Sequence, residues 1–296
     1  MKIFKNFMLA LILPVFFVSC ATSGGLVRFS SGEVIIGSES GYSDNQPAHK
    51  VNLEHAFFIC NHEVTQSEYE KIMGKNPSAF SSEAAAKENQ LNRPVDSVNW
   101  FDAIVYCNKL SKKEKLEPVY SLNGNTDCDS WGEVPYSASD PNYSAWLNGI
   151  SQNLDKNGYR LPLESEWEYA AGQKNPENLS EYAWYEGNAF SKTHEVKMKK
   201  KNDSALFDMA GNVWEWCWDS WNGKTAYEEQ AVDETENRDF FAKEKQYMYE
   251  NGRVRRGGSF LNPSPLCEPT FRSCYAPWVR NRALGFRVVR TDTKKK

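Results

Sequence analysis

Seven cysteines and four histidines are the side chains of this sequence most able to hold a metal or act as nucleophiles. Their spacing argues against zinc, because no Cys-x-x-Cys pair occurs. His62 and His194 are each followed by glutamate, but neither has the second histidine four residues on that a helical zinc site needs. We therefore expect no zinc site, which leaves free thiols and disulfides as the uses of cysteine.

A second candidate site is built from oxygen ligands. Asp208 and Glu215 lie on either side of a glycine turn in the stretch DMAGNVWE. Two carboxylates and the carbonyls of a tight loop are suitable ligands for Ca²⁺. The alternative is a capped turn that holds no ion.

The amino end predicts export and a lipid anchor. Lys2 and Lys5 precede an apolar stretch, residues 7–18, that is too short to cross a bilayer as a helix. Residues 1–19 therefore read as a signal peptide, with Cys20 as the lipidated first residue of a bacterial lipoprotein and residues 20–30 as a flexible tether. The alternative is a secretory signal with an incidental cysteine.

Export implies an oxidising compartment in which cysteines can pair. Cys107 lies on the apolar side of a predicted helix, so we expect a free, buried thiol there. The sequence does not select a connectivity among the remaining disulfide candidates. They are Cys60, Cys128, Cys217, Cys267 and Cys274.

Composition is typical of a globular domain, with 40% hydrophobic residues, 25% charged residues and a net charge of -4. This balance excludes a basic nucleic-acid-binding face. No strand-helix alternation and no glycine-rich phosphate loop after a strand are present, which disfavours a doubly wound nucleotide-binding fold. Residues 112–156 are polar and turn-rich and predict a long insertion on one side of the core.

Short elements must position the candidate residues. Strands are predicted at 33–37, 50–53, 56–59, 253–256 and 285–290, and helices at 66–73, 100–111 and 164–171. Thr65 and Glu68 form a capping box for the first helix, and Asn99 caps the second.

Five segments in order resemble the formylglycine-generating enzyme family, the sulfatase-modifying-factor domain. They are EVT at 63–65, RPVDSVNWFDA at 93–103, YRLP with EWEYAA at 159–171, DMAGNVWEW at 208–216, and RGGSF with GFR at 256–260 and 285–287. The resemblance implies a loop-rich single α+β domain of the C-type-lectin type over residues 31–290, followed by a basic tail at 291–296. It also implies calcium bound by the side chains of Asp208 and Glu215 and the carbonyls of Gly211 and Val213.

The resemblance argues against the family's oxidase chemistry in this chain. The oxidases hold copper between two cysteines in the stretch after Gly-Gly-Ser, and thiolates are soft ligands that suit Cu(I). Here Asn262 occupies the first position and Cys267 the second, with Cys274 the nearest other thiol. An amide cannot replace a thiolate on Cu(I), so no catalytic residue is predicted. The family's iron-dependent branch needs a preceding histidine-rich domain that this sequence lacks.

Residues 261–283 have an unusual composition within a variable-looking region at about 257–290. Every residue there except Glu268 and Trp278 can be reached from an asparagine codon by changing its adenines. This pattern resembles the variable lipoproteins of C-type-lectin fold that diversity-generating retroelements mutate, in particular the treponemal variable proteins. The alternative is a proline-rich loop that drifts. The predicted ligand-binding residues are Leu261, Asn262, Ser264, Leu266, Thr270, Phe271, Tyr275, Trp278, Arg280 and Arg282, with Arg272 as scaffold.

We therefore expect a non-enzymatic lipoprotein, anchored in the bacterial outer membrane or at the cell surface, that binds a protein ligand through this region. No cofactor is required, calcium is a candidate ion, and no nucleic acid is expected as a partner. One alternative is a copper-dependent formylglycine-generating oxidase acting on sulfatase-type cysteine. The other is a structural lipoprotein of the envelope.

Overall fold

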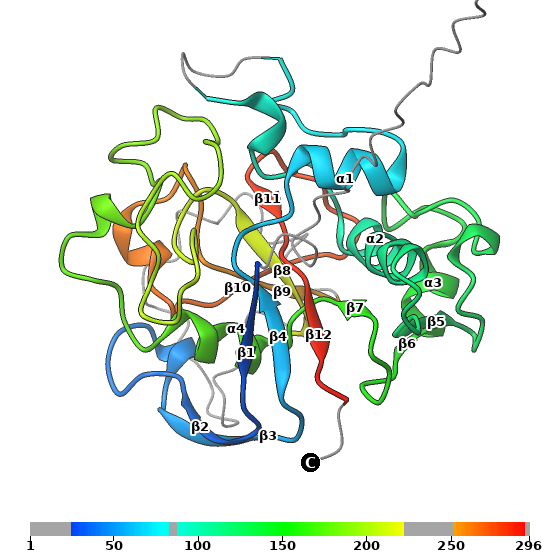
Figure 1. Ribbon diagram of the computed structural model, residues 1–296, viewed down its shortest axis with the longest axis horizontal. Coiled ribbons are helices and arrows are strands. Elements are labelled where there is room, and N and C mark those ends of the chain that lie inside the picture. Colours follow the sequence, from blue (N-terminus) through cyan, green and yellow to red (C-terminus); the bar gives the residue numbers. More distant parts are fainter. Residues whose placement is uncertain (1–24, 83–87, 222–250, 294–296) are drawn as a thin grey trace, which may run out of the picture.

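The computed structural model describes residues 25–82, 88–221 and 251–293 (Figure 1). Helices cover α1 Gln66–Met73, α2 Trp100–Lys113, α3 Tyr143–Gly149 and α4 Glu164–Ala171. The strands are β1 Leu26–Phe29, β2 Gly32–Ile36, β3 His49–Leu53, β4 Phe57–Cys60, β5 Tyr120–Leu122, β6 Ile150–Gln152, β7 Tyr159–Arg160, β8 Trp214–Ser220, β9 Arg253–Arg256, β10 Ser273–Tyr275, β11 Leu284–Gly285 and β12 Val289–Thr291. The described elements therefore mix short helices and strands, as the predicted α+β class requires.

Two four-stranded sheets join distant parts of the chain. The first has the order β1-β4-β12-β7, so β4 lies between an amino-terminal and a carboxy-terminal strand. The second has the order β10-β9-β8-β11, in which Glu215 pairs with Arg256 and also with Gly285. This second sheet brings three of the recognised motifs into contact.

The capping box of α1 and the Asn99 cap of α2 form as predicted. Thr65 Oγ1 accepts from the Glu68 amide at 3.2 Å, and the Glu68 carboxylate accepts from the Thr65 amide at 2.8 Å. Asn99 and Asp102 make the same exchange at 2.8 and 3.0 Å at the start of α2. Each exchange satisfies two backbone donors that a helix start leaves unpaired.

The predicted strand at 285–290 is wrong as a single element. Leu284–Gly285 pairs in the second sheet and Val289–Thr291 pairs in the first. Between them, the Phe286 and Val288 carbonyls accept from Val64 and Cys60 at 2.9 Å. An apolar run shows that a segment is buried, but it does not show that the segment passes from one sheet to another.

Residues 112–156 were predicted as a polar insertion, but several of their side chains are buried in the main hydrophobic core. They contain the antiparallel strand pair β5-β6 and, between these strands, α3. Trp131 and Trp146 pack edge to face with ring centroids 5.6 Å apart. β8 is not among the predicted strands, although Trp214, Trp216 and Trp218 alternate with a period of two. That alternation is the signal that could have revealed β8.

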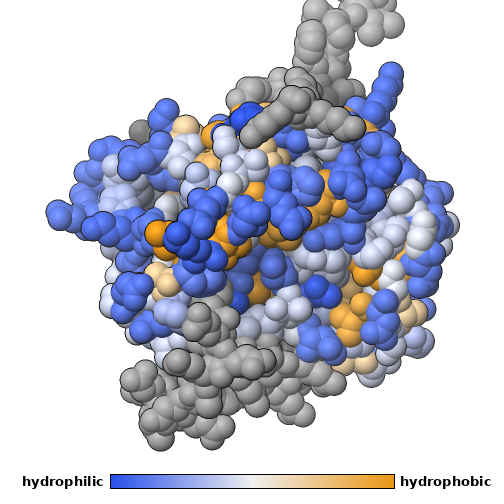
Figure 2. Space-filling model, turned by 90° about the horizontal axis from the view of Figure 1, so that it is seen from below, coloured by the Kyte–Doolittle hydropathy of each residue, from blue (hydrophilic) through white to orange (hydrophobic). Residues whose placement is uncertain are grey.

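None of the described helices is long and apolar enough to cross a bilayer. The face shown in Figure 2 is mostly hydrophilic, with hydrophobic residues in several small groups. The predicted signal peptide, the lipidated Cys20 and the end of the basic tail lie outside the described residues.

Candidate functional site

Arg287 is the centre of a buried ionic cluster that holds the 208–215 loop. Its guanidinium donates to both oxygens of Glu215 at 2.6 Å and to the carbonyls of Phe207, Asp208 and Cys60 at 3.0–3.2 Å. Arg287 and Glu215 are fully buried. The two motifs GFR and DMAGNVWEW are therefore joined by a charge-assisted fork, the strongest common type of side-chain hydrogen bond.

Two further carboxylates face this cluster. Glu63 accepts from Asn212 Nδ2 at 2.7 Å and from the Val213 amide at 3.0 Å. Burial, then the nearby charges of Asp208 and Glu215, raise the pKa of Glu63 well above its usual value. Burial likewise raises the pKa of Asp208 to about 6. Three carboxylates around one guanidinium leave an excess of buried acid, which protonation relieves.

In the predicted calcium site, the Arg287 guanidinium occupies the carboxylate oxygens of Glu215 that would bind the ion. Asp208 and Glu215 do share one cluster, but both oxygens of Glu215 face Arg287, and one also accepts from Trp167 Nε1 at 2.8 Å. One oxygen of Asp208 is buried without a hydrogen-bond partner. Within the described ranges, no three His, Cys, Asp or Glu residues are grouped so as to hold a metal ion. The predicted ligand set of Asp208, Gly211, Val213 and Glu215 therefore does not fit an ion while Glu215 is paired with Arg287.

A second buried ionic cluster ties the predicted ligand segment to α4. Glu164, at the first turn of α4, accepts from Arg272 at 2.7 Å through two nitrogens and from Arg256 at 3.2 Å. Arg256 also pairs with Glu168 and donates to the carbonyls at 269 and 270. Burial alone would raise the pKa of Glu164, but the two guanidinium groups lower it. Arg272 is a scaffold residue, as predicted.

The positions that would hold copper do not form a thiolate pair. Asn262 is buried, and its side-chain oxygen accepts from Ser259 Oγ at 2.6 Å. Cys267 is a free thiol, and burial raises its pKa to about 12. Gly258 has φ +72°, and a Cβ at this position would lie 2.6 Å from Cys267 Sγ, so the Gly-Gly-Ser turn closes directly over this sulfur. At neutral pH the site holds an amide and a protonated thiol.

Four of the predicted disulfide cysteines are buried thiols that form no disulfide: Cys128, Cys217, Cys267 and Cys274. Cys217 on β8 and Cys274 on β10 share an apolar cluster, but β9 lies between their strands. Neighbouring strands lie about 4.8 Å apart, so strands separated by a third are about 10 Å apart. This distance exceeds the limit of roughly 7 Å between the Cα atoms of two disulfide-bonded cysteines. Cys60, in contrast, is disulfide-bonded. Cys107 is a buried free thiol, as predicted.

The predicted ligand-binding residues differ in exposure. Asn262, Leu266, Thr270, Phe271 and Tyr275 are buried, Leu261 and Trp278 are half-buried, and Ser264, Arg280 and Arg282 are exposed.

Phe271 and Tyr275 are not the exposed aromatic surfaces that we expected. The Phe271 ring packs edge to face on Tyr42 at 5.0 Å and lies 6.1 Å from Trp214. The Tyr275 ring is covered by the Arg255 guanidinium at 3.4 Å. Both side chains lie on or beside the inner face of the second sheet, so tertiary packing removes them from the surface.

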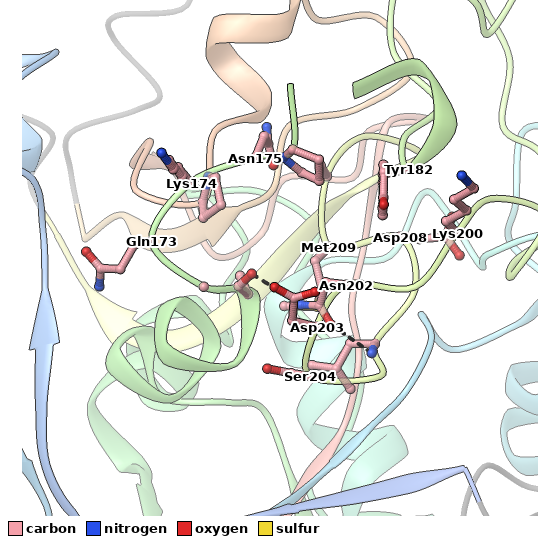
Figure 3. Close-up of a pocket in the computed structure, with 16 residues that line it drawn as sticks. Gln173, Lys174, Asn175, Tyr182, Lys200, Asn202, Asp203, Ser204, Asp208 and Met209 are labelled. Atoms are coloured by element: carbon pink, nitrogen blue, oxygen red, sulfur yellow. Dashed lines mark hydrogen bonds between the residues drawn. The ribbon is translucent and has the colours of Figure 1, made fainter. Parts of the chain in front are cut away.

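A cavity of about 400 Å³ with a mixed polar and apolar lining borders the same segment (Figure 3). Its rim carries Lys174, Tyr182 and Lys200, and its lining includes Asp208 and Pro269. Asn175, also in the lining, donates to the Cys267 carbonyl at 2.8 Å. Among its lining residues, Asp208, Met209 and Ala210 come from the DMAGNVWEW motif and Ala171 from the EWEYAA motif. Most of the remaining lining residues come from loops without a motif.

A loop around Trp184 was also missed by sequence reasoning. His194 stacks on Trp184 with ring centroids 3.9 Å apart, and Lys199 Nζ lies 3.9 Å from the Trp184 ring. Gly211 has φ +78°, and a Cβ there would lie 2.1 Å from the Trp184 carbonyl. The motif glycine is therefore needed for the close approach of this loop, a contact that no local pattern predicts.

Known proteins share this architecture. The variable protein 1 of Treponema denticola superposes with a TM-score of 0.74 at 36% identity, covering 90% of this chain and 94% of that one. The chaperone protein LppX of Paenibacillus barcinonensis is 35% identical over 232 residues, 68% of this chain and 75% of that protein. The formylglycine-generating enzyme of Streptomyces coelicolor is 31% identical over 156 residues, 44% of this chain and 46% of the enzyme.

Residues 18–292 match the model of the sulfatase-modifying factor enzyme 1-like domain. The match includes all five recognised segments and the two buried ionic clusters that those segments form. The fold is thus the loop-rich α+β, C-type-lectin-type fold of the formylglycine-generating enzymes, in one domain. This chain belongs to the family of sulfatase-modifying factor enzyme 1-like domains.

Proposed function

We propose that this chain is a non-catalytic member of its family, which binds a protein ligand through the exposed part of residues 261–282. The copper positions carry the first half of this proposal. Asn262 is engaged by Ser259, and Cys267 is a buried thiol with a pKa of about 12. The oxidase chemistry requires two thiolates on Cu(I), and this pair of side chains supplies none at neutral pH.

The exposed side chains carry the second half. Ser264, Arg280 and Arg282 reach solvent, and Leu261 and Trp278 are half-buried at the edge of the core. Tryptophan and arginine, here Trp278, Arg280 and Arg282, are among the residue types enriched in protein-binding hot spots. The similarity to a variable protein supports binding, and the similarity to a protein named as a chaperone supports a protein ligand.

Anchoring at Cys20 and diversification of the segment are further parts of the proposal. A lipid anchor would hold the domain at the outer membrane or the cell surface. Substitution of Cys20 by serine should then move the protein from the membrane fraction to the aqueous fraction. Retroelement diversification predicts a near-copy of the coding DNA with adenines at the variable positions, beside a reverse transcriptase gene. The absence of both from the flanking DNA would refute diversification.

A Cu(I) titration tests the non-catalytic assignment. The full chain is titrated against a competing Cu(I) chelator, alongside C267S, C274S and C217S variants. We expect all four proteins to leave copper with the chelator, and a sulfatase-type cysteine peptide to remain unoxidised by mass spectrometry. Copper binding that is lost in C267S and C274S but retained in C217S would establish the oxidase alternative instead.

A further inference from the structure

Phe190 is the most exposed large hydrophobic side chain of the described residues, with 84% of its surface accessible. Its φ is +52°, and the following Ser191 has φ +58°. The left-handed region is unfavourable for a residue with a Cβ by about 1–2 kcal/mol. Outliers of this kind cluster at ligand-binding sites, where the surrounding structure holds them.

The loop around Phe190 is held rigidly by its neighbours. The Ala189 amide donates to the Tyr185 carbonyl at 2.9 Å. The Ala189 carbonyl is 2.9 Å from His194 Nε2, and Nδ1 of the same ring is 2.8 Å from Glu88 Oε1. Ala189 itself is fully buried. The ring of Phe190 is therefore presented in water by a fixed backbone, which reduces the entropy lost when a partner covers it.

Phe190 lies next to the predicted ligand segment. Ala189 packs in a small cluster with Phe260 and Ala283, and this cluster is covered by the half-buried side chains of Phe80, Trp184 and Leu261. Leu261 belongs to the ligand segment. Arg282, also of that segment, lies 5.9 Å from the Phe80 ring. We call Phe80, Trp184, Phe190, Leu261 and Arg282 the Phe190 surface.

The charges around the Phe190 surface are mainly positive. Arg282 and Lys192 form no salt bridge with any residue that the structure describes. Asp96 is influenced by Arg282, but Asp96 is fully buried beneath the surface. Glu186 is the exposed acid of the 185–192 loop. The exposed Arg282 and the half-buried Lys192, against the one exposed acid Glu186, complement an acidic partner.

We propose that Phe190 is an anchor residue that inserts into an apolar pocket of a protein partner, with acidic side chains of that partner meeting Arg282 and Lys192. The proposal rests on the proposed ligand-binding function and extends its site beyond residues 261–282. Phe190 belongs to the scaffold and would make the same contact whatever the sequence of residues 261–282. The side chains of that segment would make the contacts that change when the segment is diversified.

The probe is a set of peptides selected from a phage-displayed random library on the immobilised full chain. Each enriched peptide is measured against the wild type, F190S, L261S, R282E and I35S. Ile35 is the matched control, because it is a 52% exposed hydrophobic side chain on β2. We expect F190S to weaken binding about tenfold or more, as for a hot-spot residue, and I35S to leave it unchanged. Enriched peptides should combine an apolar stretch with acidic residues.

The outcomes separate this inference from the proposed function. Peptides that depend on Leu261 and Arg282 but bind F190S within about twofold of the wild type would overturn the inference and leave the function standing. Dependence on Phe190 without dependence on Leu261 or Arg282 would overturn the proposed binding through residues 261–282 and leave Phe190 as the anchor. A library that yields no Phe190-dependent peptide would also overturn the inference. A dimer of the wild type that F190S abolishes in sedimentation would assign Phe190 to a second copy of this chain instead of a separate protein partner. Phe190-dependent binding of C20S to lipid vesicles would assign it to a membrane.

Discussion

The predicted ligand segment consists of two parts that differ in what surrounds them. Residues 266–277 are almost wholly buried, and Arg272 joins them to Glu164 on α4. Residues 261–265 and 278–282 are mostly exposed or half-buried, and Arg280 there pairs with Asp102 in the first turn of α2. The same types of residue, arginine and aromatic, therefore have opposite roles within one short stretch.

This difference limits which positions can vary. A buried arginine paired with a buried carboxylate cannot be replaced without leaving that carboxylate uncompensated. An exposed arginine can be replaced at a smaller cost when its carboxylate partner keeps another hydrogen bond, as Asp102 does with the Asn99 amide. If the segment is diversified, tolerated change should be confined to its two ends, and the middle should keep its packing.

The largest expected effect compares the two arginines. R272M should destabilise the protein by about 3–5 kcal/mol, because Glu164 loses the partner that makes two of its hydrogen bonds. R280M should cost less, about 1–2 kcal/mol, because Arg280 itself is partly exposed, although the buried Asp102 loses two hydrogen bonds. Unfolding in urea, followed by tryptophan fluorescence, measures both. Equal losses in the two variants would contradict the division of the segment.

A smaller difference is expected between two aromatic residues. F271A should lower stability by about 3 kcal/mol, since Phe271 packs against Tyr42 and Trp214. W278A should cost about 1 kcal/mol, because Trp278 is half-buried at the edge of the main core. The same variants should show the reverse order in binding of the selected peptides. A stability loss in W278A equal to that in F271A would place Trp278 in the scaffold.

The smallest expected effect is a pH dependence of stability that arises from the buried Asp96, which is influenced by the exposed Arg282. Burial raises the pKa of Asp96 to about 6 from 3.8, so the native state holds a proton that the unfolded state releases between these values. Stability from this group therefore falls as pH rises from about 4 to 6 and amounts to about 1 kcal/mol between pH 5 and pH 7.

Replacement of the titrating group tests this pH dependence. D96N should remove that part of the difference in unfolding free energy between pH 5 and pH 7, whereas the exposed-acid control D155N should not. Thermal unfolding at the two pH values provides the measurement. An unchanged difference in D96N would show that another acid, such as Asp208 with its raised pKa, dominates in this range.

Local signals in the sequence were sufficient for the elements whose ends are set by neighbouring residues. The two capping boxes, the limits of α1 and α4, and the strands at 32–36 and 49–53 follow from residues a few positions apart. The scaffold role of Arg272 and the failure of the copper pair at Asn262 also came from the motifs. These conclusions depend on residue types at fixed spacing, which a chain carries before it folds.

Tertiary structure alone decided what depends on contacts between distant segments. It buried Phe271 and Tyr275 and separated Cys217 from Cys274 by an intervening strand. It also placed Arg287 on Glu215 and brought the exposed Phe190 beside Leu261. Burial and pairing are set by which elements pack together, and side chains far apart in the chain carry no local trace of that choice. The sequence by itself therefore determined the family and the fold, and packing determined which residues of the predicted ligand segment are exposed.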